Sequence, residues 1–187
     1  MTNQHFLYHP ATLPELDAIW DKNIADNPGD DRWAEWKQTA IENQRNGDVQ
    51  TFLVMRGEVP VGEGTLVFSP RVLRGNSRLA DGAGTVNVSA LRMDQPLRGQ
   101  GHISKLVKVM EQYARDAGYK TITIGVEARE TRNLAIYLHW GYGTFVMSEI
   151  LDGELVLFYA KDLEVTDHGD DKRGKIPELP FQQRHPP

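Results

Sequence analysis

The stretch Leu91–Ser104, LRMDQPLRGQGHIS, constrains the fold more than any other part of the chain. A strand-like segment ends near Met93, a turn with Gly99 and Gly101 follows, and a helix begins at once. Glycine lets a backbone approach a ligand without a Cβ in the way. A helix N-terminus carries unpaired N–H groups and about half a positive charge, so it is suited to bind an anion. Arg98 adds a planar cation that suits phosphate oxygens, although an ordinary strand–turn–helix corner is the alternative.

The helix that follows this turn has the clearest periodicity in the chain. Its apolar residues recur every three or four positions and so form one stripe, and Gly118 is suited to end it. The segments on either side, 85–93 and 121–128, alternate like strands. The strand–helix–strand unit over 85–128 therefore predicts two parallel strands joined by a right-handed crossover.

The rest of the chain adds helices and hairpins on both sides of this unit. Thr12 followed by Glu15 is typical of a helix N-terminus with a capping box, and Asp152-Gly153 is typical of a hairpin turn. We expect helices over 11–26, 31–44 and 131–140, strands over 51–55, 59–68, 144–150 and 154–162, and a loop over 69–84. This order predicts an α/β (mixed α+β) fold, with helices on the faces of a mixed, mostly antiparallel twisted sheet.

The composition fits one globular domain. The chain has 187 residues, of which 40% are hydrophobic and 25% charged. We expect the domain to span 1–163 and the charged, Pro-rich segment 164–187 to be a tail.

A formal net charge of −5 argues against a nucleic-acid partner. No apolar run could span a bilayer and the N-terminus has no signal-peptide core, so we expect a cytoplasmic protein with no membrane partner. The absence of Cys excludes thiolate chemistry on the protein.

Two motifs, RGQG at the start of one helix and AIYLHWGY after the next strand, resemble those of the GNAT superfamily of acetyl-CoA-dependent N-acetyltransferases. The first family motif reads Arg/Gln-x-x-Gly-x-Gly/Ala; Arg98 and Gly101 match it, and Ile103 departs from it. The second motif matches with Tyr for the final Phe, and Glu130 stands where the family usually has Asn. The resemblance covers about residues 5–162 and implies the GNAT fold, whose parallel strands splay at the acyl-CoA site.

The resemblance also implies acetyl-CoA as co-substrate and names the residues that hold it. The pyrophosphate would lie on the glycine turn, and the pantetheine arm along the backbone at the end of the preceding strand. Asn133, one helical turn after Glu130, would take the role of the family's Asn. The implied acyl-CoA-binding residues are Leu91, Met93, Arg98, Gly99, Gln100, Gly101, His102, Ile103, Ser104 and Asn133. No spacing of His, Asp and Glu indicates a metal site.

Acetyl transfer to an amine needs a base for the amine and benefits from an acid at the thiolate leaving group. The motif position of Tyr137 implies the acid, because a phenol with a pKa of about 10 stays protonated beside a thiol with a pKa of about 8.5. A packed helix aromatic is the alternative for Tyr137. Glu63 and Glu127 are the candidate catalytic bases. Glu63, between two glycines, could instead be a charge at a turn or bulge, and Glu127 could pair with Arg129 at the surface.

The resemblance therefore implies an N-acetyltransferase in which a primary amine of a small molecule or peptide attacks acetyl-CoA directly. The acceptor groove is expected between the two N-terminal helices, the 69–84 loop and the closing hairpin. The acidic N-terminal helices favour a cationic acceptor, or else are a solvated face, and the arginines of the loop favour an anionic group on the acceptor. A non-catalytic acyl-CoA-binding or regulatory module and a protein N-terminal or lysine acetyltransferase are the alternatives. A homodimer is compatible with the sequence.

Overall fold

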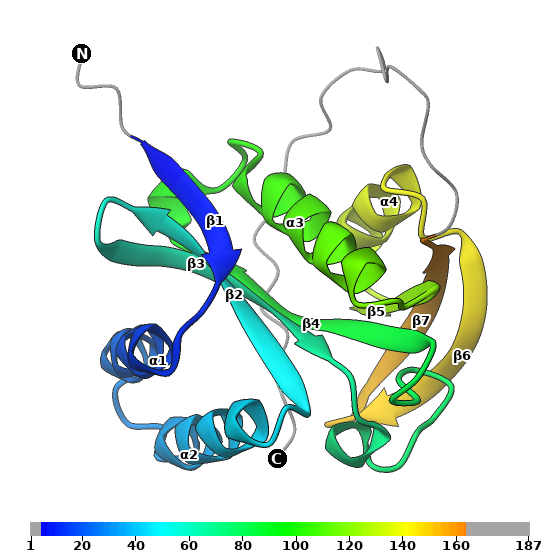
Figure 1. Cartoon of the computed structure of the whole chain (residues 1–187), viewed down its shortest axis with the longest axis horizontal. Helices are drawn as coiled ribbons and strands as arrows, with labels where there is room; N and C mark the ends of the chain where they lie inside the picture. The colour runs from blue at the N-terminus through cyan, green and yellow to red at the C-terminus, as the bar shows by residue number, and fades with distance from the viewer. Residues whose placement is uncertain (1–4, 164–187) are drawn as a thin grey trace.

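One seven-stranded sheet organises the protein, whose computed structural model describes residues 5–163 (Figure 1). The strand order is β1–β2–β3–β4–β5–β7–β6, and only β4 and β5 pair in parallel. The strands are β1 (Phe6–Pro10), β2 (Val49–Arg56), β3 (Val59–Val67), β4 (Thr85–Met93), β5 (Thr121–Glu127), β6 (Thr144–Leu151) and β7 (Glu154–Asp162). The helices are α1 (Leu13–Asp26), α2 (Arg32–Arg45), α3 (His102–Asp116) and α4 (Thr131–His139), with short 3-10 helices η1 (Pro70–Leu73) and η2 (Gln95–Leu97). The tail expected over 164–187 lies outside the described residues.

The predicted fold class and most predicted elements are confirmed. β4 covers the expected 85–93 and is parallel to β5, as the strand–helix–strand unit predicted. The capping box at the start of α1 is also present. Glu15 Oε2 accepts a hydrogen bond from the Thr12 backbone N–H at 2.8 Å, and Thr12 Oγ1 accepts one from the Glu15 N–H at 3.4 Å. These are the local features for which the sequence carries its own start and stop signals.

β1 is an edge strand that pairs with β2, and it was not predicted from the sequence. Phe6 and Tyr8 pack against the core beside α3, and the Tyr8 hydroxyl lies 2.7 Å from His102 Nδ1. A strand of five residues that ends at a proline offers few alternating positions, so its pattern alone is weak. Its place is fixed by the edge that β2 presents and by α3.

Alternate residues of the strands point to opposite faces of the sheet and pack against different helices. In β2, Phe52 and Val54 belong to the core beneath α3, whereas Leu53 and Met55 pack with apolar residues of α1 and α2. Figure 1 shows the result: α3 and α4 lie on one face of the sheet, and α1 and α2 on the other.

A bulge in β4 changes which residues face each side. Val88 before the bulge and Leu91 after it both point into the core beneath α3, an odd spacing in place of the even spacing of a regular strand. Ala90 between them has a left-handed φ of 55°, and the register between β3 and β4 shifts between Glu63 and Thr65. Such a bulge re-aims side chains and bends the strand.

β4 and β5 separate just before this bulge. Their parallel pairing runs from Thr85↔Thr121 to Val88↔Ile124 and ends there. Beyond this point β4 continues to pair with β3, and β5 continues to pair with β7. The sheet therefore opens into a gap between the C-terminal parts of its two parallel strands.

Candidate active site

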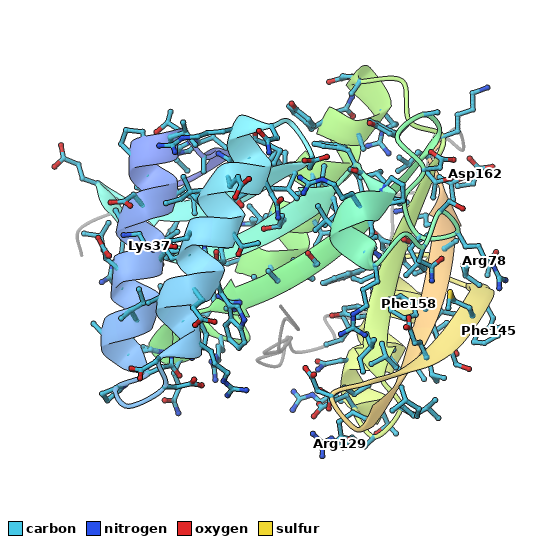
Figure 2. The ribbon with its side chains drawn as sticks, turned by 90° about the horizontal axis from the view of Figure 1, so that it is seen from below. Lys37, Arg78, Arg129, Phe145, Phe158 and Asp162 are labelled. Atoms are coloured by element: carbon cyan, nitrogen blue, oxygen red, sulfur yellow. The ribbon has the colours of Figure 1, made fainter. Side chains whose placement is uncertain are left out.

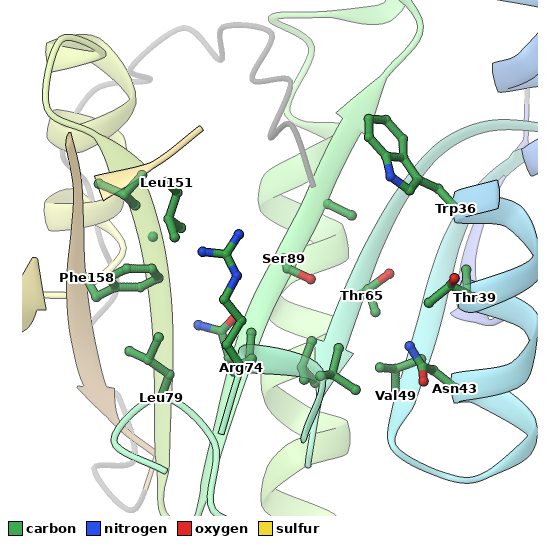
Figure 3. A pocket seen from close by; sticks show the side chains of 18 of the residues that line it. Trp36, Thr39, Asn43, Val49, Thr65, Arg74, Leu79, Ser89, Leu151 and Phe158 are labelled. Atoms are coloured by element: carbon green, nitrogen blue, oxygen red, sulfur yellow. The ribbon is translucent and has the colours of Figure 1, made fainter. Parts of the chain in front are cut away.

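A cavity of about 400 Å³ lies on the face of the sheet that carries α1 and α2 (Figure 3). Its walls come from both of these helices, from η1 and the loop after it, and from the β6–β7 hairpin. Ser89 and Ala90 on β4, and Gly125 and Glu127 on β5, also line it. These four residues lie beyond the last parallel pair, so the cavity reaches the gap between the strands. Its volume is within the range of about 300–1,000 Å³ that small-molecule sites occupy.

The outer wall of this cavity is the pair α1 and α2, which lie side by side with Lys37 between them (Figure 2). Lys37 Nζ lies 2.8 Å from Asp17 and 2.6 Å from Asp21, and Lys22 Nζ lies 2.5 Å from Asp94. Two acids of α1 are therefore paired with a lysine of α2, and a lysine of α1 is paired with an acid that follows β4. The pairing fits the interpretation of a solvated face better than that of a rim that attracts a cation.

Glu63 lies in the middle of β3 and lines the cavity, although only 2% of the residue is exposed. Its Oε1 accepts hydrogen bonds from Arg92 Nη1 and Asn23 Nδ2, both at 2.8 Å. Within residues 5–163, Oε2 receives no hydrogen bond from the protein. Glu63 is therefore not a turn charge but a fixed carboxylate with one oxygen left for a ligand.

Arg92, which holds Glu63, is enclosed by indole rings. Its Cζ lies 5.4 Å from the ring centre of Trp20 and 4.9 Å from that of Trp33. Its Nε and Nη2 are buried and have no hydrogen-bond partner in the described part of the chain. Cation–π contacts with the rings offset part of that cost. Sequence reasoning missed Arg92 and Asn23, because the strand register and the α1 packing that bring them to Glu63 are long-range.

Glu127, the other candidate base, lies at the end of β5 in the opposite wall. Its Oε2 accepts a hydrogen bond from Arg129 Nε at 2.9 Å and forms an ion pair with Arg129 Nη2, also at 2.9 Å. Arg129 Nη1 also lies 2.8 Å from Glu154 Oε1. The structure therefore contains the Glu127–Arg129 pair that the sequence offered as the alternative to a catalytic role.

The glycine turn before α3 has the backbone shape expected of it. Gly99 and Gly101 have left-handed φ values of 75° and 81°, and a Cβ at Gly101 would meet no atom within 4 Å. The two polar side chains of the turn bind the turn itself. Arg98 Nε donates to the Met93 carbonyl at 2.8 Å, and Gln100 Nε2 donates to a backbone carbonyl at 3.0 Å. Hydrogen bonds from these two side chains to backbone carbonyls therefore stabilise the turn, and there is open space next to Gly101.

The other residues predicted to bind acyl-CoA divide by what their side chains do. His102 is buried against β1 through Tyr8, and Ile103 packs on the core beneath α3. Ser104 is half-buried in the first turn of the helix. The side chains of Leu91 and Met93 lie in the same core. The side chains of His102, Ile103, Leu91 and Met93 are therefore engaged in packing, so a role of these residues in binding would fall to their backbone.

Tyr137 lies on α4 with 2% of the residue exposed, and its ring centre is 5.6 Å from that of Trp140. Burial, and after it the nearby Glu130 carboxylate, raises the pKa of the Tyr137 phenol well above its ordinary value. Asn133, also buried on α4, donates from Nδ2 to Glu130 Oε2 at 3.2 Å. Tyr137 and α3 pack on one face of the sheet, and the cavity lies on the other face. The gap between β4 and β5 lies between these two faces.

Comparison with known proteins shows the family to which the chain belongs. A family model described as acetyltransferase (GNAT) family matches residues 14–142. The chain belongs to the GNAT acetyltransferase family. A comparison with curated proteins gives no match.

Solved acetyltransferase structures share the fold at low sequence identity. An N-acetyltransferase from Staphylococcus aureus Mu50 is 20% identical with a TM-score of 0.58, covering 86% of this chain and 99% of that one. The yncA protein of Salmonella typhimurium, solved with its cofactor acetyl-CoA, is 17% identical with a TM-score of 0.60, covering 89% and 98%. A Salmonella typhimurium acetyl transferase that modifies the N-terminal serine of ribosomal protein L7/L12 is 14% identical with a TM-score of 0.62, covering 84% and 94%.

Across residues 5–163, no helix combines the length and the hydropathy needed to cross a membrane. Within the same residues, no group of three or more His, Cys, Asp or Glu side chains is placed to hold a metal ion.

Proposed function

We propose that this GNAT protein transfers an acetyl group from acetyl-CoA to the primary amine of a small molecule or peptide held in the cavity. The observation that carries the proposal is that the cavity opens onto the gap between β4 and β5. On the other face, the same gap faces α3, with its glycine turn, and α4, with Tyr137. An acceptor and an acyl donor bound on opposite faces would meet there.

The residues on the α3 face fit acetyl-CoA. The left-handed glycines leave room outside Gly101, and the first turn of a fifteen-residue helix suits the negative charge of a pyrophosphate. The backbone of Leu91–Met93, at the separated edge of β4, would hold the pantetheine arm. When bound, acetyl-CoA supplies an acetyl group activated as a thioester.

Glu63 and Tyr137 are the residues to which we assign the proton transfers. Glu63 Oε2 accepts the proton that the acceptor ammonium must lose before its nitrogen can attack, directly or through one water. Tyr137 donates a proton toward the sulfur as the carbon–sulfur bond breaks, and its raised pKa keeps it protonated until then. Of the two candidate carboxylates we prefer Glu63, because Arg92 and Asn23 hold it in a buried position, whereas the partner of Glu127 is the exposed Arg129 side chain.

The test is release of CoA thiol from acetyl-CoA over a panel of primary amines, with wild type and Tyr137→Phe compared. Amine-dependent release by the wild type is the expected result. If acetyl-CoA binds but no amine is acetylated, the protein is a binding or regulatory module on the GNAT fold. If peptides with a free N-terminus react and small amines do not, it is a protein acetyltransferase.

A further inference from the structure

The cavity contains three arginines, and two of them are occupied by hydrogen bonds within the protein. Arg71 Nη2 binds Asp48 and Asn43, and Arg129 binds Glu127. The Arg74 side chain has no hydrogen bond in the described residues, although its backbone N–H donates to the Pro70 carbonyl. Its nearest acid is Glu149, at 4.0 Å, and 48% of its side chain is exposed. Among these arginines, Arg74 alone keeps its five N–H donors for solvent or a ligand.

Arg74 is also placed to meet a ligand. It caps η1 with a left-handed φ of 56°, a conformation that costs a residue with a side chain about 1–2 kcal/mol. Figure 3 shows its side chain rising from the loop into the cavity, between Ser89 on β4 and Phe158 on β7 in that view. Glycine would adopt this left-handed φ without the cost that a Cβ imposes, so an arginine at this position does not stabilise the turn.

The charges of the lining select the kind of anion. Five carboxylates and three guanidinium groups line the cavity, so its side chains carry net negative charge. A dianion such as a phosphate monoester would be repelled by this excess. A single carboxylate on a molecule that also carries an ammonium group would not, because Arg74 and Glu63 Oε2 each offer one opposite charge to one end of it.

We propose that Arg74 binds a carboxylate of the acceptor, so that the substrate class is an amino acid, an amine that carries a carboxylate. The inference rests on the proposed function and makes it more specific. The Arg74 fork holds the carboxylate at the wall formed by η1 and the loop after it, through paired N–H donors. Glu63 Oε2 receives the ammonium end beneath the gap, where its nitrogen is acetylated. The cavity lining also includes apolar side chains, Trp36 and Phe158 among them, which suit the hydrocarbon part of such an acceptor.

The test uses matched acceptors: ω-amino carboxylates of increasing chain length, and the corresponding carboxamides, which have the same amine and no negative charge. For wild type we expect the carboxylate of the best length to have a KM about 10- to 100-fold below that of its amide. Arg74→Gln should remove this difference by raising the KM of the carboxylate alone, with kcat unchanged. Arg56→Gln, an exposed arginine outside the cavity, should leave both values unchanged.

Two further measurements separate this inference from the proposed function. Calorimetric binding of the same acid and amide to the protein, without turnover, should show the same preference in wild type and its loss in Arg74→Gln. Arg74→Gly should lose the preference while its melting temperature is equal to or above that of wild type, since glycine relaxes the turn. Turnover of amides as fast as acids, or equal binding of both, overturns the carboxylate site while leaving acetyl transfer standing. Absence of turnover with a preserved binding preference would contradict the proposed function and not the site.

Discussion

Glu63 Oε1 lies 2.8 Å from Arg92 Nη1, and this ion pair joins β3 to β4 beneath α1. Only 2% of the Glu63 side chain and 10% of the Arg92 side chain are exposed. Asn23 on α1 binds the same oxygen, so three elements fix one carboxylate. The arrangement leaves the other oxygen of this cavity-lining residue without a hydrogen bond in residues 5–163, which is why we assign Glu63 rather than a more exposed acid to the reaction.

Replacement of Glu63 tests this assignment. Glu63→Gln keeps the size and an oxygen for Arg92 but cannot take up a proton, so we expect kcat/KM to fall by about 10²- to 10⁴-fold. Loss of the charge next to a buried guanidinium should also lower the free energy of unfolding by about 1–3 kcal/mol. Activity is therefore measured well below the melting temperature of the variant. Glu127→Gln is the matched control, and a larger loss there than in Glu63→Gln would reverse the assignment.

Tyr137 and Tyr142 form a second matched pair. Tyr137→Phe keeps the ring and its packing on Trp140, so we expect its main effect on turnover, a loss of about 100-fold or more. Tyr142→Phe removes a hydroxyl that donates to the buried Glu111 carboxylate at 3.0 Å, so we expect unfolding free energy to fall by about 1–3 kcal/mol while kcat is kept. Steady-state kinetics and thermal melts of both variants check this. Retained turnover in Tyr137→Phe would remove the acid role.

Asp81 gives a prediction about pH. Its Oδ1 accepts hydrogen bonds from the backbone N–H groups of Ala83, Gly84 and Thr85 at 2.8–2.9 Å. Burial alone would raise the pKa of Asp81, but these hydrogen bonds outweigh it and the pKa lies below its ordinary value. Asp81→Ala should lower the free energy of unfolding by about 1–2 kcal/mol at neutral pH, as loss of a helix cap does.

The sign of the pH effect follows from the lowered pKa of Asp81. The stabilisation is present above the unfolded-state pKa of about 3.9 and is lost as pH falls through the lower folded-state pKa. Urea unfolding should therefore show the gap between wild type and Asp81→Ala narrowing below about pH 4. Glu58→Ala, which removes an exposed carboxylate from the β2–β3 turn, serves as control. A gap that stays constant into acid would show that the charge of Asp81 is not what holds the loop.

Gly125 on β5 tests the packing beside the gap. A Cβ there would lie 2.7 Å from Phe158 Cε1, and a ring cannot move aside as a flexible chain end can. Gly125→Ala should destabilise the protein by about 1–3 kcal/mol and raise the acceptor KM, because it displaces a ring that lines the cavity. Gly143→Ala has open space and should be neutral or stabilising by up to about 1 kcal/mol. Equal melting temperatures for the two variants would contradict this.

Local signals in the sequence were enough for most of the fold. The capping box at Thr12, the stripe of α3 and the turn at Asp152-Gly153 each specify an element through neighbours in the chain. β1 could not be predicted in the same way, because it is held in place by pairing with the edge of β2 and its own five residues show only a weak pattern.

The site was harder to predict than the fold, for a physical reason. The face on which Glu63 and Arg92 meet depends on the bulge at Ala90. Alanine rarely adopts a left-handed φ, so its presence at this position does not predict a bulge. The sequence did contain the groups that the family motif names, such as Gly101 and Tyr137. It could not show that Arg98 would bind its own turn.

Two-substrate kinetics of CoA release test the central claim most directly. If acceptor and acetyl-CoA occupy opposite faces and meet at the gap between β4 and β5, both must be bound at once. Double-reciprocal plots of rate against acceptor, at several fixed acetyl-CoA concentrations, should then give intersecting lines. Parallel lines would indicate an acetylated enzyme in place of direct attack, and would contradict the account.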